Sequence, residues 1–440
     1  MEQPAFTDDP GALFVLPPPA CLRAKATWIV ARNWVLGARA RFGRAHVLTP
    51  EGKLTDDRLL DVINSRSPSV PVRHGLRRTV PQAARTLIRD AETWWRRNRY
   101  ETGHPETVVV KTDLRFVWQH HSLFFRMGEQ CARQLGAPLV QFVEALQVWE
   151  SRRWGVKRPG WSNVLQSRGE LPQLRAADVV ACVSTDVADA VRCLGIPESR
   201  IVVTPNVADP SRFFPGDGTG ARRSLGFAPD ALVIGWIGSF RPFHGLEELV
   251  DAFSTLARDH ARARLLLIGD GQQRARVEEM IGSLGMRERV RLTGELPYDE
   301  VPAMIRAMDV AVISSRSGDL AKYHYSPLKL REYLGCGVPV LAPAVGEIAR
   351  DFCTSAGVLT YPCGDRVAMV RELARLLLDP SLRTSMASHL RPRTSSNASL
   401  CVSIDTIIDR LRALRASGSL STVPLTLTVD HRARTGHTPG

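Results

Sequence analysis

The sequence lacks three features that would each place the protein in a different class. No run of about 18 or more apolar residues occurs among its 440 residues, so we expect no membrane-spanning helix. The N-terminus is polar and acidic, without a basic start or an apolar core, so we expect no secretory signal. The eight cysteines form no Cys-x-x-Cys pair, which argues against a zinc site.

The cysteines also indicate a cellular compartment. Several of them, including Cys182 and Cys336, fall within apolar runs. Buried free thiols in a reducing cytoplasm explain this pattern better than a disulfide framework does. We therefore expect a cytoplasmic protein.

Positive charge is in excess and is concentrated near the N-terminus. The formal net charge is +13, and the stretch Cys21–Glu101 holds 17 Lys and Arg against 7 Asp and Glu, an excess of 10. Such a basic face predicts an anionic partner, such as the inner face of a membrane, a lipid phosphate or an acidic polymer. An arginine-rich composition without functional meaning explains the same numbers almost equally well.

Within this stretch, the helix predicted over Gln82–Tyr100 is amphipathic and carries several arginines. Its apolar positions are Ala84, Leu87, Ile88, Ala91, Trp94 and Trp95. A basic helix with tryptophans can lie on a membrane surface. Such a stripe more often faces the core of the protein, and this second interpretation is favoured.

From about Ala177 onward, apolar strands alternate regularly with helical patterns. The strands are continuous apolar runs, as in a parallel sheet that is covered on both faces. In the second half they are predicted at Leu232–Ile237, Arg264–Ile268, Val290–Leu292, Val310–Ser314 and Val338–Ala342. This half is therefore predicted to be a Rossmann-like, doubly wound α/β domain. The first half is less regular, with strands predicted at Ala45–Thr49, Thr107–Lys111, Pro138–Phe142, Asp178–Ser184 and Arg200–Pro205.

The segment Tyr325–Val340 is the most informative part of the sequence. It predicts a loop, a short helix opened by Ser326 and Pro327, a glycine break and a buried strand. Serine caps the N–H groups at a helix start, and proline fits the first turn. A helix N-terminus that points into a loop suits a phosphate. Glu332 lies further along this mostly apolar helix and needs a partner, which a pair of sugar hydroxyls would provide.

This segment closely resembles the donor-binding helix of the retaining glycosyltransferases of family 4, which have the GT-B fold. Two other stretches, Gly235–Gly245 and Arg200–Asp209, resemble the same family. The resemblance is strong from about Ala177 to Met386. It implies two Rossmann-like, doubly wound domains that face each other across a cleft. The expected regions are an acceptor-binding domain over 1–208, a nucleotide-sugar-binding domain over 209–393, a terminal helix over 394–415 returning to the first domain, and a disordered tail over 416–440.

The resemblance also implies which residues bind the donor. The family's usual arginine and lysine positions hold Ser239 and His244 here, so we expect Arg241 to replace the missing arginine at the diphosphate. His244 would add a weaker, pH-dependent contact, and the alternative is an ordinary loop histidine. Lys329 would reach the phosphates, or else is simply solvated. The nucleotide-sugar-binding set is completed by Gly238, Ser239, His244, Ser326, Pro327, Leu328, Glu332 and Gly294.

Two further expectations concern the sugar and the ribose. Glu332 matches the second carboxylate of the family's Glu-x7-Glu pattern, which binds the ribose hydroxyls, whereas the first carboxylate is replaced by His324. In the family, a histidine after a strand of the first domain touches the transferred sugar, and His120 or its neighbour His121 could do so. A packed or hydrated histidine is the more common alternative. The expected catalytic residues are Arg241, Lys329 and His120, with Glu144, Trp149 and Glu150 near the acceptor.

The predicted function is a metal-independent, retaining glycosyltransferase that uses a nucleoside-diphosphate sugar and needs no cofactor. The absence of any Asp-x-Asp motif argues against a metal-bridged diphosphate. The acceptor is expected to be a glycan, a lipid-linked molecule or a small molecule, and no nucleic-acid partner is expected. The alternative is a catalytically silent relative that acts as a binding or scaffold subunit. A nicotinamide dehydrogenase has little support, because no Gly-x-Gly-x-x-Gly follows a strand.

Overall fold

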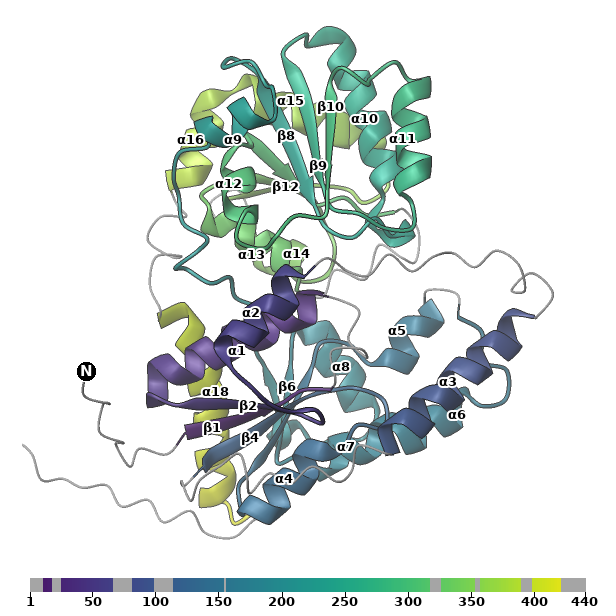
Figure 1. Ribbon diagram of the computed structural model, residues 1–440, viewed down its shortest axis with the longest axis vertical. Helices are drawn as coiled ribbons and strands as arrows, with labels where there is room; N and C mark the ends of the chain where they lie inside the picture. Colours follow the sequence, from purple (N-terminus) through teal and green to yellow (C-terminus); the bar gives the residue numbers. More distant parts are fainter. Residues whose placement is uncertain are drawn as a thin grey trace, which may run out of the picture.

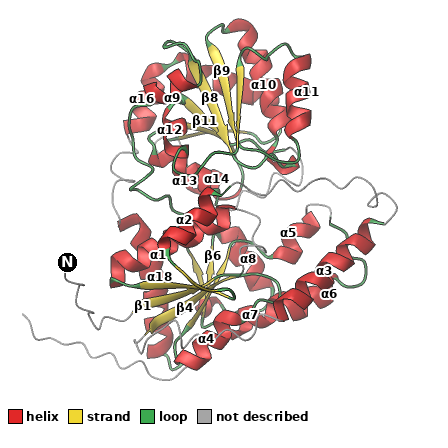
Figure 2. Cartoon of the chain, viewed as in Figure 1, coloured by secondary structure: helices red, strands yellow, loops and turns green. Residues whose placement is uncertain are grey.

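The computed structural model consists of two α/β lobes, one above the other in Figure 1. It describes residues 11–17, 25–65, 81–98, 114–153, 156–316, 326–352, 357–388 and 398–420. Each lobe is built around one sheet with helices packed against it (Figure 2). His324 and most of the tail that was predicted over 416–440 lie outside the described residues.

The sheet of the first lobe has the strand order β3-β2-β1-β4-β5-β6-β7. The edge strand β3 pairs antiparallel with β2, and the other pairs are parallel. Every residue of β1, β5 and β6 is buried, as expected for a sheet that is covered on both faces. The strands are β1 Gly11–Val15, β2 Ala45–Thr49, β3 Gly52–Leu54, β4 Leu114–His120, β5 Leu139–Val143, β6 Val179–Cys182 and β7 Ile201–Val203.

The centre of this sheet differs from the sequence prediction. β1 was not predicted, and the expectation that Trp118 and His120 lie in a loop or helical segment after a strand is wrong. Both residues belong to β4, where the Trp118 ring is fully buried and stacks on Phe142 with 5.2 Å between ring centroids. Aromatic and β-branched residues favour strands, and six of the seven residues of β4 are buried. The strand predicted at Thr107–Lys111 lies outside the described residues.

The helices of the first lobe alternate with its strands, as in a doubly wound fold. A π-helical turn, Gln166–Glu170, separates α6 from α7. Ser184 begins α8, and its hydroxyl accepts a hydrogen bond from the N–H of Val187 at 3.3 Å. The helices are α1 Lys25–Phe42, α2 Asp56–Asn64, α3 Gln82–Asn98, α4 Met127–Leu135, α5 Gln147–Arg153, α6 Ser162–Leu165, α7 Leu171–Ala176 and α8 Thr185–Cys193.

The sheet of the second lobe is parallel and has the order β10-β9-β8-β11-β12-β13. All five strands that the sequence predicted here are present, and β13 is added at one edge. The strands are β8 Leu232–Ile237, β9 Ala263–Ile268, β10 Val290–Gly294, β11 Val310–Val312, β12 Val340–Pro343 and β13 Val358–Tyr361. The helices are α9 Thr219–Ser224, α10 Leu246–Asp259, α11 Arg274–Ser283, α12 Val301–Arg306, α13 Leu328–Gly335, α14 Gly346–Asp351, α15 Arg366–Leu378 and α16 Pro380–Ser388.

The last described helix, α18 (Ala398–Ala416), lies in the first lobe although it follows the second in sequence (Figure 1). It packs closely on α1, where Gly37 faces the carbonyl of Leu400. A Cβ atom on Gly37 would lie 2.3 Å from that oxygen, so the close approach requires glycine. Arg41 Nε bonds Asp405 at 2.7 Å across the same contact. The helix therefore ties the end of the chain to its beginning.

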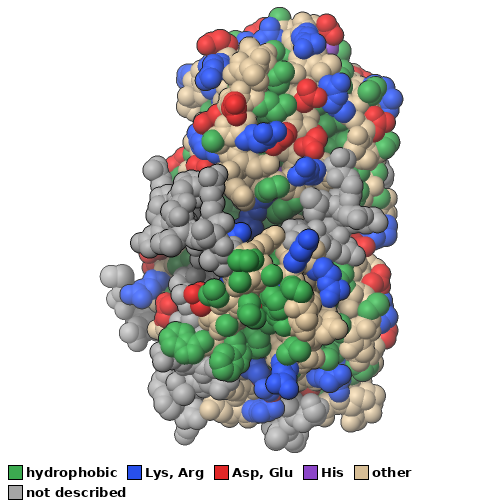
Figure 3. Space-filling model, turned by 90° about the vertical axis from the view of Figure 1, so that its right-hand side faces the viewer, with side chains coloured by type: hydrophobic (Ala, Val, Ile, Leu, Met, Phe, Trp, Pro, Cys, Tyr) green, Lys and Arg blue, Asp and Glu red, His purple; other side chains and the backbone are tan. Residues whose placement is uncertain are grey.

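Polar contacts also join the two lobes directly. Lys25 Nζ of α1 lies 2.6 Å from a carboxylate oxygen of Glu295, which follows β10. Asn64 at the end of α2 accepts a hydrogen bond from the N–H of Tyr298 at 2.9 Å. Figure 3 shows a hollow between the lobes in which lysine or arginine side chains are visible. The carboxyl edges of both sheets point toward this junction (Figure 2).

The helix α3 is oriented opposite to the favoured sequence interpretation. Its apolar residues Leu87, Ile88, Trp94 and Trp95 are 49 to 56% exposed, whereas Thr86 and Asp90 are buried. The prediction of a core-facing apolar stripe is therefore wrong, since the polar side of the helix packs on the lobe. In the described part of the chain, no helix is long and apolar enough to cross a membrane.

Candidate active site

The first component of the site is the turn that follows β8. Gly238 adopts φ +149° and donates its N–H to the carbonyl of Ile268 at 3.0 Å. A Cβ atom at this position would lie 3.0 Å from the Trp236 ring and 3.1 Å from Lys329 Nζ. Glycine is thus required both by the backbone conformation and by the crowding around it. The turn lies at the carboxyl edge of the sheet, where open α/β folds bind ligands.

The residues after this turn form a short 3₁₀ helix, Pro242–His244, with Arg241 exposed immediately before it. The His244 ring packs edge-on against Trp236, with 5.5 Å between centroids. Its carbonyl accepts a hydrogen bond from the Ser314 hydroxyl at 2.6 Å. Arg241 is therefore the exposed cation of this loop, while the histidine ring helps to pack it.

Lys329 approaches the same turn from helix α13. Its Nζ lies 4.2 Å from the Trp236 ring centroid, a distance at which a cation interacts with the π face. The atom is buried and has no hydrogen-bonding partner among the described residues. Burial lowers the pKa of Lys329 to about 7, although nearby Glu332 favours the charged form. An anion beside this amine would satisfy it.

Glu332 lies one turn further along α13 and is only 5% exposed. The Tyr298 hydroxyl donates a hydrogen bond to Glu332 Oε1 at 3.1 Å. Burial raises the pKa of Glu332 to about 7, while Tyr298 and Lys329 both favour its ionised form. Such a carboxylate gains from any additional hydrogen-bond donor, such as a ligand hydroxyl.

The start of α13 differs from the prediction that Ser326 caps it. Pro327 is the N-cap residue, and no side chain caps the helix. The Ser326 hydroxyl instead accepts a hydrogen bond from the N–H of Asn206 at 3.2 Å, and Asn206 Nδ2 donates to the Ser326 carbonyl at 2.8 Å. The serine therefore attaches the linker between the lobes to the loop before α13. Leu328 begins the helix directly after Pro327.

Gly294, the last residue of β10, lies beside a different glycine. Its carbonyl accepts a hydrogen bond from the N–H of Gly269 at 2.9 Å, and it adopts φ +75°. The neighbouring Glu295 is the partner of Lys25 from the first lobe. Gly294 therefore forms a turn beside the neighbouring strand β9. Its described contacts do not include Lys329 or Glu332.

The first lobe contributes a group of histidines and carboxylates at the carboxyl edge of its sheet. His120 Nε2 lies 3.2 Å from Glu144 Oε2, the same oxygen that accepts a hydrogen bond from the Thr27 hydroxyl. His121 Nε2 lies 3.6 Å from Glu170, which is fully buried on the π-helical turn. Turns of this kind occur frequently at functional sites.

The Glu150 carboxyl on α5 connects this group to the second lobe. Its pKa is raised to about 8 by burial first, and then by the charges of Glu144 and Glu170. The charge of Arg241 acts in the opposite direction. Because Arg241 belongs to the second lobe, this influence indicates that its loop lies near the carboxyls of the first lobe.

Sequence reasoning missed three residues of the site. Tyr298 and Trp236 support Glu332 and Lys329, and Asn206 holds the loop before α13. Trp236 lies inside a predicted strand and inside the family-resembling stretch Gly235–Gly245, but neither pattern indicated that its ring would contact Lys329. Tyr298 follows a proline in a turn, where an aromatic residue with a polar tip is a weak signal for a buried hydrogen bond.

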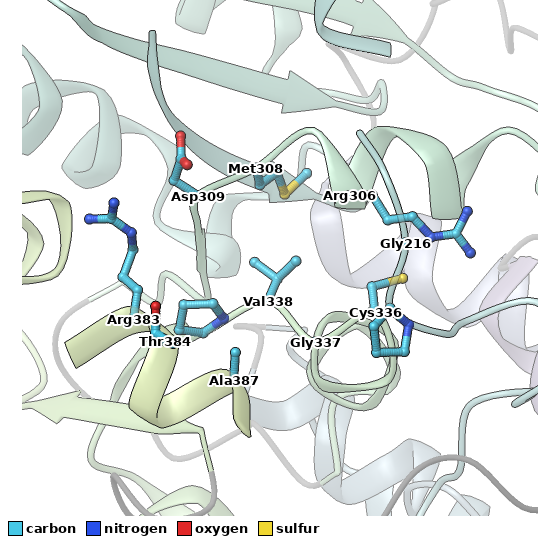
Figure 4. Close-up of a pocket in the computed structure, with 12 residues that line it drawn as sticks. Gly216, Arg306, Met308, Asp309, Cys336, Gly337, Val338, Arg383, Thr384 and Ala387 are labelled. Atoms are coloured by element: carbon cyan, nitrogen blue, oxygen red, sulfur yellow. The ribbon is translucent and has the colours of Figure 1, made fainter. Parts of the chain in front are cut away.

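A cavity of about 680 Å³ in the second lobe lies away from this site (Figure 4). It borders the amino ends of β11 and β12, whereas the site is at the carboxyl edge. Its two arginines are engaged with backbone: Arg306 donates to the Phe214 carbonyl at 2.9 Å, and Arg383 to that of Leu376 at 2.6 Å. Both cationic side chains at the cavity are therefore already occupied. Among the described residues, no cluster of His, Cys, Asp or Glu could hold a metal ion.

Two family models match successive parts of the chain. The model described as Glycosyltransferase Family 4 matches residues 28–212, and Glycosyl transferases group 1 matches residues 219–392. Together they cover both lobes. The chain belongs to glycosyltransferase family 4. The family and the glycosyltransferase class of enzyme that the three motifs predicted are confirmed.

Curated relatives in this family are glycosyltransferases with different acceptors. The D-inositol 3-phosphate glycosyltransferase of Actinosynnema mirum is 29% identical over 66% of this chain and 68% of its own length. The 2-deoxystreptamine N-acetyl-D-glucosaminyltransferase of Streptomyces fradiae is 30% identical over 49% of this chain and 51% of its own. The chain thus spans between about half and two thirds of these relatives.

Solved structures of low sequence identity share the fold along almost the whole chain. HepE from Anabaena, crystallised with UDP and glucose, has a TM-score of 0.58 at 16% identity and covers 92% of this chain and 99% of its own. WaaG, a glycosyltransferase involved in lipopolysaccharide biosynthesis, has a TM-score of 0.58 at 15% identity, covering 90% and 98%. The predicted GT-B fold of two facing Rossmann-like domains is confirmed.

Proposed function

We propose that this family 4 protein is a metal-independent, retaining glycosyltransferase that moves a sugar from a nucleoside-diphosphate sugar to an acceptor hydroxyl. The observation that carries the proposal is the cluster at the carboxyl edge of β8. There Lys329 Nζ lies beside Gly238, and the buried Glu332 follows one turn later on the same helix. A cation at a glycine turn and a carboxylate beyond it match the diphosphate and the ribose of one donor.

In this proposal the diphosphate occupies the space between the Gly238–His244 loop and the start of α13. Arg241 supplies an exposed guanidinium fork, and Lys329 a buried amine without a protein partner. Backbone N–H groups of Ser239 and Leu328 border the same space. Two added negative charges would restore the protonated form of Lys329, whose pKa burial has lowered to about 7. These cations stabilise the charge that grows as the diphosphate leaves.

The nucleoside is held deeper in the second lobe. Glu332 accepts hydrogen bonds from the ribose hydroxyls in addition to the one from Tyr298. We assign Ser326 and Pro327 to the wall around the sugar-phosphate part, because they immediately precede α13. Gly294 and His244 border the site as a turn and as a packed ring. None of these contacts identifies the base of the donor nucleotide. The similar structure HepE was crystallised with UDP.

The transfer step needs no nucleophile from the protein. The bond between the anomeric carbon and the diphosphate oxygen breaks as the acceptor oxygen bonds that carbon on the same face. The acceptor proton passes to a departing phosphate oxygen. We assign His120 to the transferred sugar, because Glu144 orients its ring at 3.2 Å and Nδ1 has no hydrogen-bonding partner among the described residues. Contact with the transferred sugar is the catalytic role that we propose for His120.

The acceptor side is rich in carboxyls, which favours a polyhydroxylated or amine-bearing acceptor over a strongly anionic one. Glu144 follows β5, Glu150 is on α5 and Glu170 is on the π-helical turn, all in the first lobe. Acceptors of the curated relatives include both an inositol phosphate and 2-deoxystreptamine. We therefore propose a glycan, a lipid-linked glycan or a small polyol, and a cytoplasmic location that cell fractionation would test.

Release of nucleoside diphosphate from a panel of sugar nucleotides tests the proposal. Arg241→Ala is expected to lower kcat by about 10²-fold or more, because one charge-assisted contact to the leaving group is lost. Arg258→Ala is the matched control, since Arg258 is exposed in the last turn of α10, at the end of the helix remote from the loop. Retention is read from the anomeric configuration of the product by NMR.

Three outcomes separate the alternatives. Turnover that survives Arg241→Ala unchanged would contradict the assigned diphosphate site. Tight binding of a sugar nucleotide by calorimetry without any turnover would favour the alternative function of a silent binding or scaffold subunit. Turnover that is abolished by EDTA and restored by a divalent cation would overturn metal independence.

A further inference from the structure

Five exposed apolar side chains lie on helices α3 and α6 of the first lobe, which are joined through Asp90. The side chains of Leu87, Ile88, Trp94 and Trp95 on α3 are 49%, 56%, 51% and 51% exposed, and Val164 on α6 is 52% exposed. They make up five of the ten large hydrophobic side chains recorded as exposed in the described residues. We call these five residues the α3–α6 face. Isolated exposed apolar residues are ordinary, but a group on adjoining helices marks an interaction surface.

The structure holds α3 in this orientation through its polar side. Asp90 is 6% exposed and binds Arg158 through two contacts, at 2.7 and 3.2 Å. The Trp161 indole N–H, immediately before α6, donates to the same carboxylate at 3.1 Å. Asp90 thus joins α3 to the segment that carries Val164. A buried ion pair on one side of the helix commits the opposite, apolar side to the outside of the protein.

Basic side chains border the α3–α6 face. Arg85 and Arg89 are exposed on α3, Lys157 is exposed before α6, and Arg168 is exposed on the π-helical turn after it. Figure 3 shows apolar side chains gathered on the lower lobe of that view, with lysine and arginine side chains along their border. The face therefore combines apolar side chains, two tryptophans and a positively charged rim.

We propose that the α3–α6 face docks on the surface of an anionic lipid bilayer. Tryptophan at the level of the headgroups, aliphatic side chains below it and arginines paired with lipid phosphates are the arrangement of a helix that lies in the membrane interface. A second copy of the chain fits less well, because a self-complementary contact would bring Arg85 and Arg89 close to their own equivalents. The net charge of +13 also favours binding to an anionic surface.

Docking through this face would set the orientation of the proposed active site relative to the bilayer. The π-helical turn that follows α6 carries Glu170, whose carboxylate contacts His121 and the N–H of Val148. Helix α5, which carries Glu150, lies between α3 and the second lobe in Figure 1. A bilayer against the α3–α6 face therefore lies next to the first-lobe side of the gap. The proposal concerns the surface alone and does not depend on the donor chemistry.

Vesicle co-sedimentation of the full chain tests the proposal. The unmodified protein is expected to sediment with vesicles of phosphatidylcholine and phosphatidylglycerol and to stay in solution with phosphatidylcholine alone. The double variant Trp94→Ser/Trp95→Ser should weaken the partition coefficient by about tenfold or more. Arg85→Glu/Arg89→Glu should abolish the preference for anionic vesicles. Val402→Ser, which alters a 61% exposed valine on α18, is the matched control and should bind normally.

A second readout separates docking from unfolding. Quenching of tryptophan fluorescence by brominated lipid should occur in the unmodified protein and fall in the Trp94→Ser/Trp95→Ser variant, while the Tm of the variant stays unchanged. The proposal is overturned if anionic vesicles do not bind, or if Val402→Ser weakens binding as much. It is also overturned if light scattering shows a dimer that the tryptophan variant dissociates, because a second copy then covers the face.

Discussion

Replacing Glu332 by glutamine should stabilise the protein while weakening its proposed donor site. The carboxylate is 5% exposed, and burial raises its pKa from 4.5 to about 7. The folded protein therefore retains a proton on Glu332 that the unfolded chain has already lost. Glutamine is neutral at every pH and keeps an oxygen for the Tyr298 hydroxyl, so the cost of burying the ionised group disappears.

The sign and size follow from linkage. A raised carboxyl pKa contributes stability that is fully present below pH 4.5 and is lost as pH rises through about 7. At about 1.4 kcal/mol per pKa unit, the loss at pH 8 is roughly 3 kcal/mol. The pKa of about 7 already includes the attraction to Lys329, so this loss is a net figure and we expect Glu332→Gln to gain roughly 3 kcal/mol at pH 8. The gain should shrink steadily toward pH 5.

Urea unfolding at pH 5.5, 7 and 8 measures this difference, and calorimetry with a nucleoside diphosphate measures the cost to binding. Asp209→Asn is the matched control, since Asp209 is also buried, at 1% exposed, but its pKa is shifted in the opposite direction. Burial raises its pKa, but the Arg32 and Ser211 contacts outweigh burial and hold the pKa below 3.8. The ionised Asp209 carboxylate stabilises the folded protein above that pH, and this contribution is lost on acidification. The asparagine variant should therefore be less stable at pH 8.

Two results would refute the reasoning. If Glu332→Gln is less stable than the unmodified protein at pH 8, the carboxylate is satisfied in the folded state and the cost assigned to its burial is wrong. If the difference between the two proteins is the same at pH 5.5 and pH 8, Glu332 does not titrate in that range. Nucleotide affinity that is unchanged in the variant would remove Glu332 from the ribose site.

Two further predictions concern the gap between the lobes. Because the pKa of Glu150 is raised to about 8 by burial and by its carboxylate neighbours, transfer should slow as pH rises through about 8, when its new charge competes for Arg241. Glu150→Gln should flatten initial rates between pH 6.5 and 9, and an unchanged falling limb would contradict this. Asn64→Ala removes the acceptor for the Tyr298 N–H and should raise the donor KM by about three- to tenfold, with unfolding free energy altered by about 1 kcal/mol. An equal loss in kcat with KM constant would argue against coupling through Tyr298.

The second lobe was predictable because its burial is uniform. β8, β9 and β11 are mostly buried, so their sequences are nearly continuous apolar runs, interrupted in β9 by Arg264, as expected for a covered parallel sheet. The family resemblance then followed from glycine and proline positions, such as Gly238, where the backbone itself excludes other residues. Backbone requirements of this kind are visible in a single sequence because few residue types can meet them.

Side-chain partners from distant parts of the chain were less visible. Ser326 has the sequence pattern of a helix cap, yet its hydroxyl binds the backbone of Asn206, which is 120 residues away. A local pattern cannot show that a competing donor arrives from another element. Lys329 on α13 shows the same limit, since its burial beneath the turn after β8 depends on Trp236 of that strand, 93 residues away.

The reversed orientation of α3 shows most clearly why amphipathic patterns need a partner before they can be interpreted. The spacing of Leu87, Ile88 and Trp94 shows that one side of the helix is apolar. It does not show whether that side faces the protein core or the outside of the protein. That choice depends on Asp90, whose bond to Arg158 spans 68 residues and turns the polar side inward. A carboxylate in an amphipathic helix is ordinarily solvated, so the sequence gives no reason to treat this one as an anchor. The apolar side is therefore exposed because a buried ion pair outweighs the usual preference for placing tryptophan and leucine inside.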